Sequence, residues 1–265
     1  MNDPKQPKRM PVMFVGHGSP MNALEDNPWS RGFTALSSHM GEPNAILAIS
    51  AHWYVDGTRV TAQPNPRTIH DFGGFPPALY EVSYPAPGHP ELASRVETLL
   101  GASTVDLDTD WGLDHGTWSV LRWISPNARI PTIQLSIDRR LSARQHFELA
   151  QKLADLREEG VLILASGNIV HNLGDAFHRM RTQSHETPDW AVSFDASVKE
   201  MLMQRDTDSL LAALDSEVGR LAHPTPEHWL PLIYAYGVSD PRDTTVFFSE
   251  GFDWGSISMR NVVFG

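Results

Sequence analysis

The chain has 265 residues, of which 41% are hydrophobic and 20% are charged. That composition is typical of a folded globular protein and excludes a disordered or fibrous chain. The formal net charge is −11 and no basic stripe is present, which excludes nucleic acid and anionic membranes as partners. The absence of cysteine excludes disulfides, cysteine-rich metal sites and cysteine nucleophiles. With neither a signal peptide nor an apolar run of the ~20 residues that cross a bilayer, the sequence predicts a soluble, cytoplasmic protein.

Short apolar runs alternate with helical patterns along the chain. The runs that predict strands are 11–15, 45–50, 130–135, 161–166 and 245–249. The spacing of apolar residues predicts helices over 91–100, 142–157, 190–203 and 209–214. Near-continuous apolar strands are typical of a sheet covered on both faces. We therefore expect an α/β fold, a single three-layer α/β/α domain around a mixed, largely parallel sheet. It spans 11–265 and follows a flexible N-terminal segment, 1–10.

A proline- and glycine-rich stretch, 63–90, does not fit the alternation of strands and helices. Long ordered loops in compact domains are usually lids or binding loops. Its aromatic residues include Phe72, Phe75 and Tyr80, which predict either a wall for an aromatic substrate or a packed surface cover.

Histidine is abundant, with 12 residues, and His17, His52 and His171 share a local context. Each follows a predicted buried strand within five positions, after small residues that open a turn. The carboxyl ends of strands in an open α/β sheet form the crevice where ligands bind. These histidines are therefore predicted to converge on one metal ion. Imidazole ligands suit zinc, iron, copper and nickel alike, so the donors do not select the metal.

Two further histidines are candidates for the same site. His228 lies near the N-terminus of a predicted helix, which starts at Thr225-Pro226 or is delayed by Pro231 until after the histidine. His115 lies in a turn ahead of a helical stretch. A helix N-terminus favours the neutral, ligating imidazole. The remaining histidines are interpreted as ordinary hydrogen-bonding residues, namely His39, His70, His89, His146, His178, His185 and His223.

Other catalytic motifs fail. Gly16-His17-Gly18 begins like a dinucleotide fingerprint, but Pro20 and Met21 break the pattern. A phosphate-binding P-loop is absent from the sequence, and neither Ser19 nor Ser166 stands in a G-x-S-x-G elbow, which argues against a serine hydrolase.

Together, six motifs resemble the LigB-type class III extradiol ring-cleavage dioxygenases, in the DOPA 4,5-dioxygenase branch. The resemblance runs from about Pro11 to Gly265, so 11–265 is expected to be a LigB-like catalytic domain. The matching motifs are Gly16-His17-Gly18-Ser19-Pro20, Ser50-Ala51-His52-Trp53, the loop from Asp71 to Pro87, Asp114-His115-Gly116-Thr117-Trp118, Gly167-Asn168-Ile169-Val170-His171-Asn172 and Glu227-His228-Trp229-Leu230-Pro231.

The resemblance implies one divalent metal per subunit, held by His17, His52 and His228. His171 is implied as a fourth ligand or as the catalytic acid–base, and His115 as a residue facing oxygen and substrate. Better-known members of the superfamily use two histidines and a carboxylate. Here His228 stands in the carboxylate's place, next to Glu227.

The activity implied is insertion of O₂ into the ring of a small catechol, DOPA-like, to give a ring-opened semialdehyde. Ring opening requires a redox-active ion such as Fe(II), because Zn(II) has no second redox state. Members of this branch nevertheless also hold zinc. The unperturbed pKa of histidine, ~6.5, suits His171 to take and return a proton around neutral pH. The alternatives are a zinc-dependent hydrolase and a non-catalytic metal-containing binding protein on the same fold. The oligomeric state and the physiological catechol do not follow from the sequence.

Overall fold

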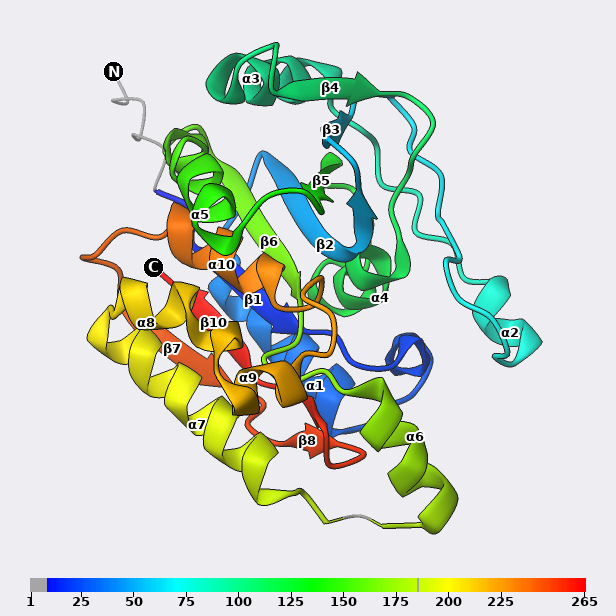
Figure 1. Ribbon diagram of the computed structural model, residues 1–265. Helices are drawn as coiled ribbons and strands as arrows, with labels where there is room; N and C mark the ends of the chain where they lie inside the picture. The colour runs from blue at the N-terminus through cyan, green and yellow to red at the C-terminus, as the bar shows by residue number, and fades with distance from the viewer. Residues whose placement is uncertain (1–8, 185) are drawn as a thin grey trace.

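A computed structural model describes residues 9–184 and 186–265 of the chain (Figure 1). Its strands are β1 Val12–Gly16, β2 Ala45–Val55, β3 Thr58–Thr61, β4 Val105–Asp108, β5 Thr132–Asp138, β6 Val161–Gly167, β7 Thr245–Phe248, β8 Phe252–Asp253, β9 Ile257–Ser258 and β10 Asn261–Phe264. Its α-helices are α1 Pro28–Leu36, α2 Pro77–Tyr80, α3 Pro90–Leu100, α4 His115–Ile124, α5 Ala143–Gln151, α6 Leu173–Thr182, α7 Asp189–Gln204, α8 Thr207–Leu211, α9 Glu217–Ala222 and α10 Leu230–Val238.

The main sheet has eight strands in the order β4-β3-β5-β2-β6-β1-β10-β7, and β8 and β9 form a separate hairpin. The four central strands, β5-β2-β6-β1, run parallel to their neighbours. Antiparallel pairs flank them, β3 with β5 on one side and β1-β10-β7 on the other. The sheet is therefore mixed with a parallel centre, as the apolar runs predicted.

Helices cover both faces of the sheet. Successive side chains in a strand point to opposite faces, so each strand contributes side chains to the core on both sides. In β1, Val12 and Phe14 belong to a core cluster with residues of α3, α5, α7 and α10. Met13 and Val15 belong to a second cluster with residues of α1 and α4. The two clusters form the layers on either side of the sheet, which confirms the three-layer α/β/α fold.

Helix starts follow local capping chemistry. The side chains of Asn27 and Ser142 accept backbone hydrogen bonds from the first turn of α1 and α5, and the backbone N–H of each cap residue donates to the side chain at N3. Such reciprocal caps satisfy backbone donors that have no partner within the helix. Asp114 caps α4 through Thr117 N–H, which fixes the position of His115 as the first residue of that helix.

The predicted elements are found, but some differ in their bounds and further elements were not predicted, among them α1 and α6. The helix predicted over 209–214 is divided into α8 and a 3₁₀ turn at Ala213–Asp215. The pattern over 142–157 breaks after Gln151, and a 3₁₀ helix at Ala154–Arg157 completes it. Strand β2 continues to Val55, five residues past the predicted end. The flanking strands β3, β4 and β10 were not predicted.

At the N-terminal end of the described chain, residues 9 and 10 contact the rest of the domain, although the sequence predicted a flexible segment over 1–10. Arg9 contacts Glu158 and Asp240, and Met10 N–H donates to Arg157 C=O, while 1–8 and His185 lie outside the described residues. Within the described part of the chain, the structure has no helix both long and apolar enough to cross a bilayer.

Candidate metal centre

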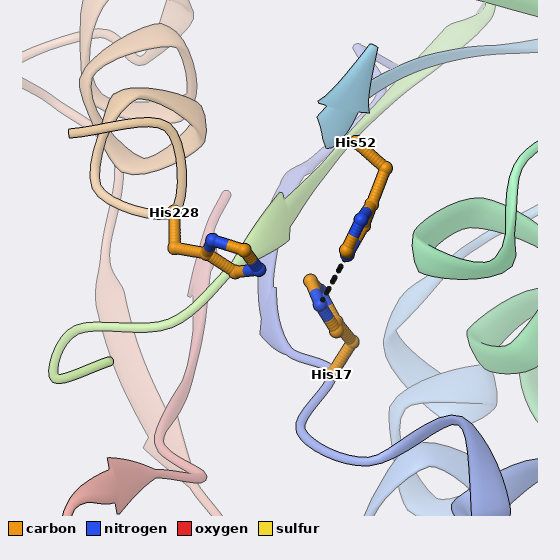
Figure 2. Close-up of side chains that lie close together, drawn as sticks. All are labelled: His17, His52 and His228. Carbon is orange, nitrogen blue, oxygen red and sulfur yellow. Dashed lines mark hydrogen bonds between the residues drawn. The ribbon is translucent and has the colours of Figure 1, made fainter. Parts of the chain in front are cut away.

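His17, His52 and His228 come together although they lie far apart in the sequence. One ring nitrogen of each lies within 4.8 Å of the others, and Figure 2 shows the three rings converging on one point. His17 directly follows β1, His52 lies in the last part of β2, and His228 lies in the turn before α10. The parallel strands β1 and β2 flank β6, so their carboxyl ends bring two of the rings together.

The spacing of the rings fits a metal ion. Nε2 of His17 lies 3.1 Å from Nε2 of His52, the contact drawn as a dashed line in Figure 2. Two nitrogens bound to one zinc at ~2.0–2.1 Å in tetrahedral geometry lie roughly 3.3 Å apart. The observed separation is close to that edge length, so a cation fits between the rings.

The tautomer of His17 follows from its hydrogen bonds. The Ser166 hydroxyl donates to Gly116 C=O at 2.5 Å, and its oxygen lies 2.9 Å from Nδ1 of His17. Because that hydroxyl proton is already used, the imidazole must donate from Nδ1. Nε2 of His17 is therefore the unprotonated nitrogen that faces the other two rings.

His52 and His228 have the same arrangement with carboxylates. Nδ1 of His52 lies 3.3 Å from Asp71 Oδ2, and Nδ1 of His228 lies 3.2 Å from Glu227 Oε1. A hydrogen bond from the outer ring nitrogen to an oxygen acceptor orients an imidazole and raises its basicity as a ligand. All three rings thus have an oxygen acceptor at Nδ1 and leave Nε2 for a metal.

Burial keeps the three rings neutral. It is the largest cause that lowers the pKa of His17, His52 and His228 well below the ordinary value of 6.5, and charge repulsion between neighbouring imidazoles lowers it further. A neutral imidazole is the form that binds a metal. The group as folded is therefore ready to accept a cation.

Asp71 connects the group to His115. Its Oδ2 lies 2.8 Å from Nδ1 of His115, and its Oδ1 accepts the backbone N–H of the same residue at 2.8 Å. Burial alone would raise the pKa of Asp71, but the hydrogen bonds from His115 lower it below its ordinary value. The carboxylate is thus ionised and fixes His115 with its ring 3.8 Å, centroid to centroid, from His52.

His171 lies beside the group. Its ring stacks on His228 with centroids 3.5 Å apart and planes 7° from parallel. It forms a second possible metal-holding set with His228 and Glu227, which shares His228 with the set of His17, His52 and His228. Burial is the main cause that lowers the pKa of His171 to about 3, so its imidazole is neutral.

A cavity of about 470 Å³ opens onto these rings. All of His17, His52, His115, His171 and His228 line it. Phe72 and Phe75, from the proline-rich stretch, form part of the wall, whereas Tyr80 contacts Phe72 from behind and is 40% exposed. The remaining walls are formed by α6 and by the β8-β9 hairpin, through Leu173, Ala176, Phe177, Met180, Asp253, Trp254 and Ile257.

Close backbone approaches hold the rings in place. A Cβ on Gly116 would lie 2.9 Å from the ring of His52, so α4 packs against that histidine only with glycine here. Asn168 N–H donates to His228 C=O at 3.0 Å, which ties the turn that carries His228 to the end of β6.

Two sequence interpretations need correction. His52 lies within β2 and not after it, because the apolar run ends at Ser50 while the strand continues. His115 is the first residue of α4 and not part of a preceding turn. The predicted delay of the last helix by Pro231 is confirmed, since α10 begins at Leu230.

Several site residues were not identified from the sequence. The orienting roles of Asp71 and Ser166, and the wall residues Asp253 and Trp254, follow only from tertiary contacts. Asp71 lies in a motif that carried the family resemblance, which is the one signal that pointed to it. His223, assigned an ordinary role, hydrogen-bonds to Ile169 C=O through Nε2.

The fold and site define an α/β protein with a histidine centre for one metal at the carboxyl edge of its sheet. This chain belongs to the LigB family. The family model, described as the catalytic LigB subunit of aromatic ring-opening dioxygenase, matches residues 11–265. The match confirms the resemblance seen in the motifs.

Proteins similar to this chain are named as extradiol dioxygenases. The chain is 48% identical to a 4,5-DOPA dioxygenase extradiol of Escherichia coli (strain K12), covering 97% of this chain and 95% of the relative. A protein of the same name from Beta vulgaris is 36% identical, with 96% of each chain covered. The crystal structure of an uncharacterized protein from Escherichia coli K12 superposes with a TM-score of 0.83 at 43% identity, covering 97% of this chain and 100% of the other.

Proposed function

We propose that this protein is an extradiol dioxygenase that opens the ring of a DOPA-like catechol. The observation that carries the proposal is the convergence of three neutral imidazoles, those of His17, His52 and His228, on a cavity walled by Phe72 and Phe75. The cavity has the size and apolar lining of a small-molecule site. Relatives named for this activity cover nearly the whole chain.

His17, His52 and His228 would hold one divalent ion. Since all three donors are neutral, the full charge of the ion would be left to attract an anionic ligand such as a catecholate. Fe(II) is the proposed ion for ring opening, because it supplies electron transfer between catechol and O₂, which Zn(II) does not. Three imidazoles also suit zinc, so we expect zinc to bind in the same place.

The other residues of the cavity bind the substrate and move its protons. Phe72 and Phe75 pack against the catechol ring and exclude water. A neutral ring nitrogen of His171 accepts a proton from a catechol hydroxyl and later returns it. His115 donates from Nδ1 to Asp71, so its Nε2 faces the cavity as a hydrogen-bond acceptor for a hydroxyl of the substrate.

The reaction is balanced without an external reductant. The ring bond beside the two hydroxyl-bearing carbons breaks, the O–O bond breaks, and both oxygen atoms enter the semialdehyde product. The four electrons that reduce O₂ come from the catechol itself.

The test is oxygen uptake with DOPA after anaerobic loading with Fe(II). We expect uptake together with a yellow semialdehyde, and neither with 3-O-methyl-DOPA, which cannot bind through two free hydroxyls. Zinc-loaded protein is the matched control and should be inactive. Bound Fe(II) without uptake would contradict the proposal, and ester hydrolysis by the zinc form alone would favour a zinc hydrolase.

A further inference from the structure

Apart from the histidines, the charged side chains that line the cavity are all carboxylates. Its lining contains two carboxylates, Asp71 and Asp253, and among the described residues that form its walls there is no lysine or arginine. The Asp71 carboxylate already contacts the Nδ1 atoms of His115 and His52. Asp253, in contrast, has no ion pair with any described residue. Asp253 accepts a backbone hydrogen bond from Trp254, but its charge is not balanced by a cationic side chain and can be balanced by a ligand.

The β8-β9 hairpin places Asp253 in line with the centre. Asp253 pairs with Ile257 across the hairpin, and Ile257 forms an antiparallel bridge with His171. Directly opposed residues in antiparallel strands project to the same face, and all three residues line the cavity. Two strand spacings of ~4.8 Å put the backbone of Asp253 about 10 Å from that of His171. A catechol that reaches the metal centre thus extends its side chain toward Asp253.

The surroundings of Asp253 favour a cationic neighbour. Burial is the main cause that raises the pKa of Asp253 above its ordinary value, and the charge of Glu25 raises it further, although a backbone hydrogen bond from Trp254 lowers it. The ionised carboxylate is thus partly desolvated, and no cation stands beside it among the described ion pairs. Trp254 lines the same wall in a left-handed conformation, φ 47°, rarely adopted by a bulky residue. Its indole adds an aromatic surface that attracts cations.

We propose that Asp253 determines substrate specificity by binding an ammonium group on the side chain of the catechol. The substrate class is a catechol with a short cationic tail. A carboxylate on the tail gains nothing in this cavity, so a catechol amine binds at least as well as the corresponding amino acid, and a catechol acid binds worst. This inference rests on the proposed function, since the catechol must first occupy the metal centre.

The test measures binding to the zinc-loaded protein at pH 7.5 by calorimetry, where no turnover occurs. The ligands are dopamine, 4-ethylcatechol and 3-(3,4-dihydroxyphenyl)propionate, which differ mainly in tail charge. We expect wild-type affinity in that order, with dopamine about 10-fold tighter than 4-ethylcatechol, as for a charge-assisted hydrogen bond. Asp253→Asn should bring the dopamine-to-ethylcatechol ratio close to one.

Asp189→Asn is the control, because it removes the same charge from an exposed position on α7; its ratio should match the wild type. Equal affinities for the three ligands in the wild type, which needs no variant, would overturn the inference. An unchanged ratio in folded Asp253→Asn would also overturn it. Binding with the expected order but no ring opening by the Fe(II) enzyme would contradict only the proposed function. Binding of none of the catechols would refute both.

Discussion

At the scale of single residues, one hydrogen bond to each ring decides which nitrogen can bind a metal. The Ser166 hydroxyl, Asp71 and Glu227 each face the Nδ1 atom of one candidate ligand. Loss of such an oxygen partner typically costs 10–100-fold in metal affinity or activity. We therefore expect metal binding to depend on these oxygen partners as well as on the proposed ligands.

The ligand assignment predicts that His17→Ala and His52→Ala each lose the metal. Two remaining imidazoles leave the ion without the third protein ligand that catalytic zinc sites use. Elemental analysis of the purified variants is the measurement, and the control is His178→Ala, which removes an exposed histidine from α6. Full occupancy in either variant would refute the assigned role of that residue.

His171→Ala is expected to reduce turnover far more than metal content. A general acid–base contributes typically 10²–10⁴-fold to a rate, whereas His17, His52 and His228 form a metal-holding group without His171. Oxygen uptake and metal analysis on the same sample give the comparison. An emptied site would make His171 a structural ligand, and His115 would then be the first candidate for the base.

At the scale of elements, the end of β2 shows how a strand can place a ligand. β2 pairs with β6 only as far as Ser50, and its register with β5 shifts between Ile49 and Tyr54. This irregularity releases the segment that contains His52 from regular pairing. A pattern of apolar residues reports burial and carries no signal for such a shift, which is why the strand was predicted to end at Ser50.

The proline-rich stretch is anchored by buried polar contacts. Tyr84 is 2% exposed, its hydroxyl donates to Ser125 C=O at 2.8 Å, and its backbone N–H donates to Thr68 Oγ1. These contacts hold the segment that carries Phe72 and Phe75 against α4. The stretch therefore forms a fixed wall of the cavity.

Tyr84→Phe should lower the free energy of unfolding by about 1 kcal/mol, since it removes one buried hydrogen bond and leaves a carbonyl without its partner. Denaturant unfolding measures the change. Tyr80→Phe is the matched control, because Tyr80 is 40% exposed and its loss of a hydroxyl should change stability by only a few tenths of a kcal/mol. Equal effects of the two substitutions would contradict the anchoring role.

At the scale of the whole molecule, buried histidines make stability depend on pH. His146 lies outside the metal centre, in α5, with its Nδ1 3.0 Å from the hydroxyl of Tyr234 in α10. Burial lowers the pKa of His146 to about 4, below its ordinary value of 6.5. Between these values the unfolded chain binds a proton that the folded protein does not, so acid favours unfolding.

Between pH 7.5 and pH 5, we expect the free energy of unfolding of the wild type to fall by about 2 kcal/mol more than that of His146→Gln. Urea unfolding of both proteins at the two pH values gives the difference. The other buried histidines are common to both proteins and cancel. His178→Gln, an exposed change, should behave as the wild type, and a parallel loss in His146→Gln would contradict the buried, neutral state of His146.

From the sequence alone we could predict the α/β class, the central strands and the histidines that gather at one edge of the sheet, because apolar runs report burial and strand ends report where ligands gather. The motifs also sufficed to place the chain in its family. Tertiary structure alone decided that Asp71 orients His115, that Ser166 selects the tautomer of His17, and that Asp253 faces the cavity. Those roles depend on distances between segments remote in the chain, and such distances are set by packing, on which local sequence patterns carry no information.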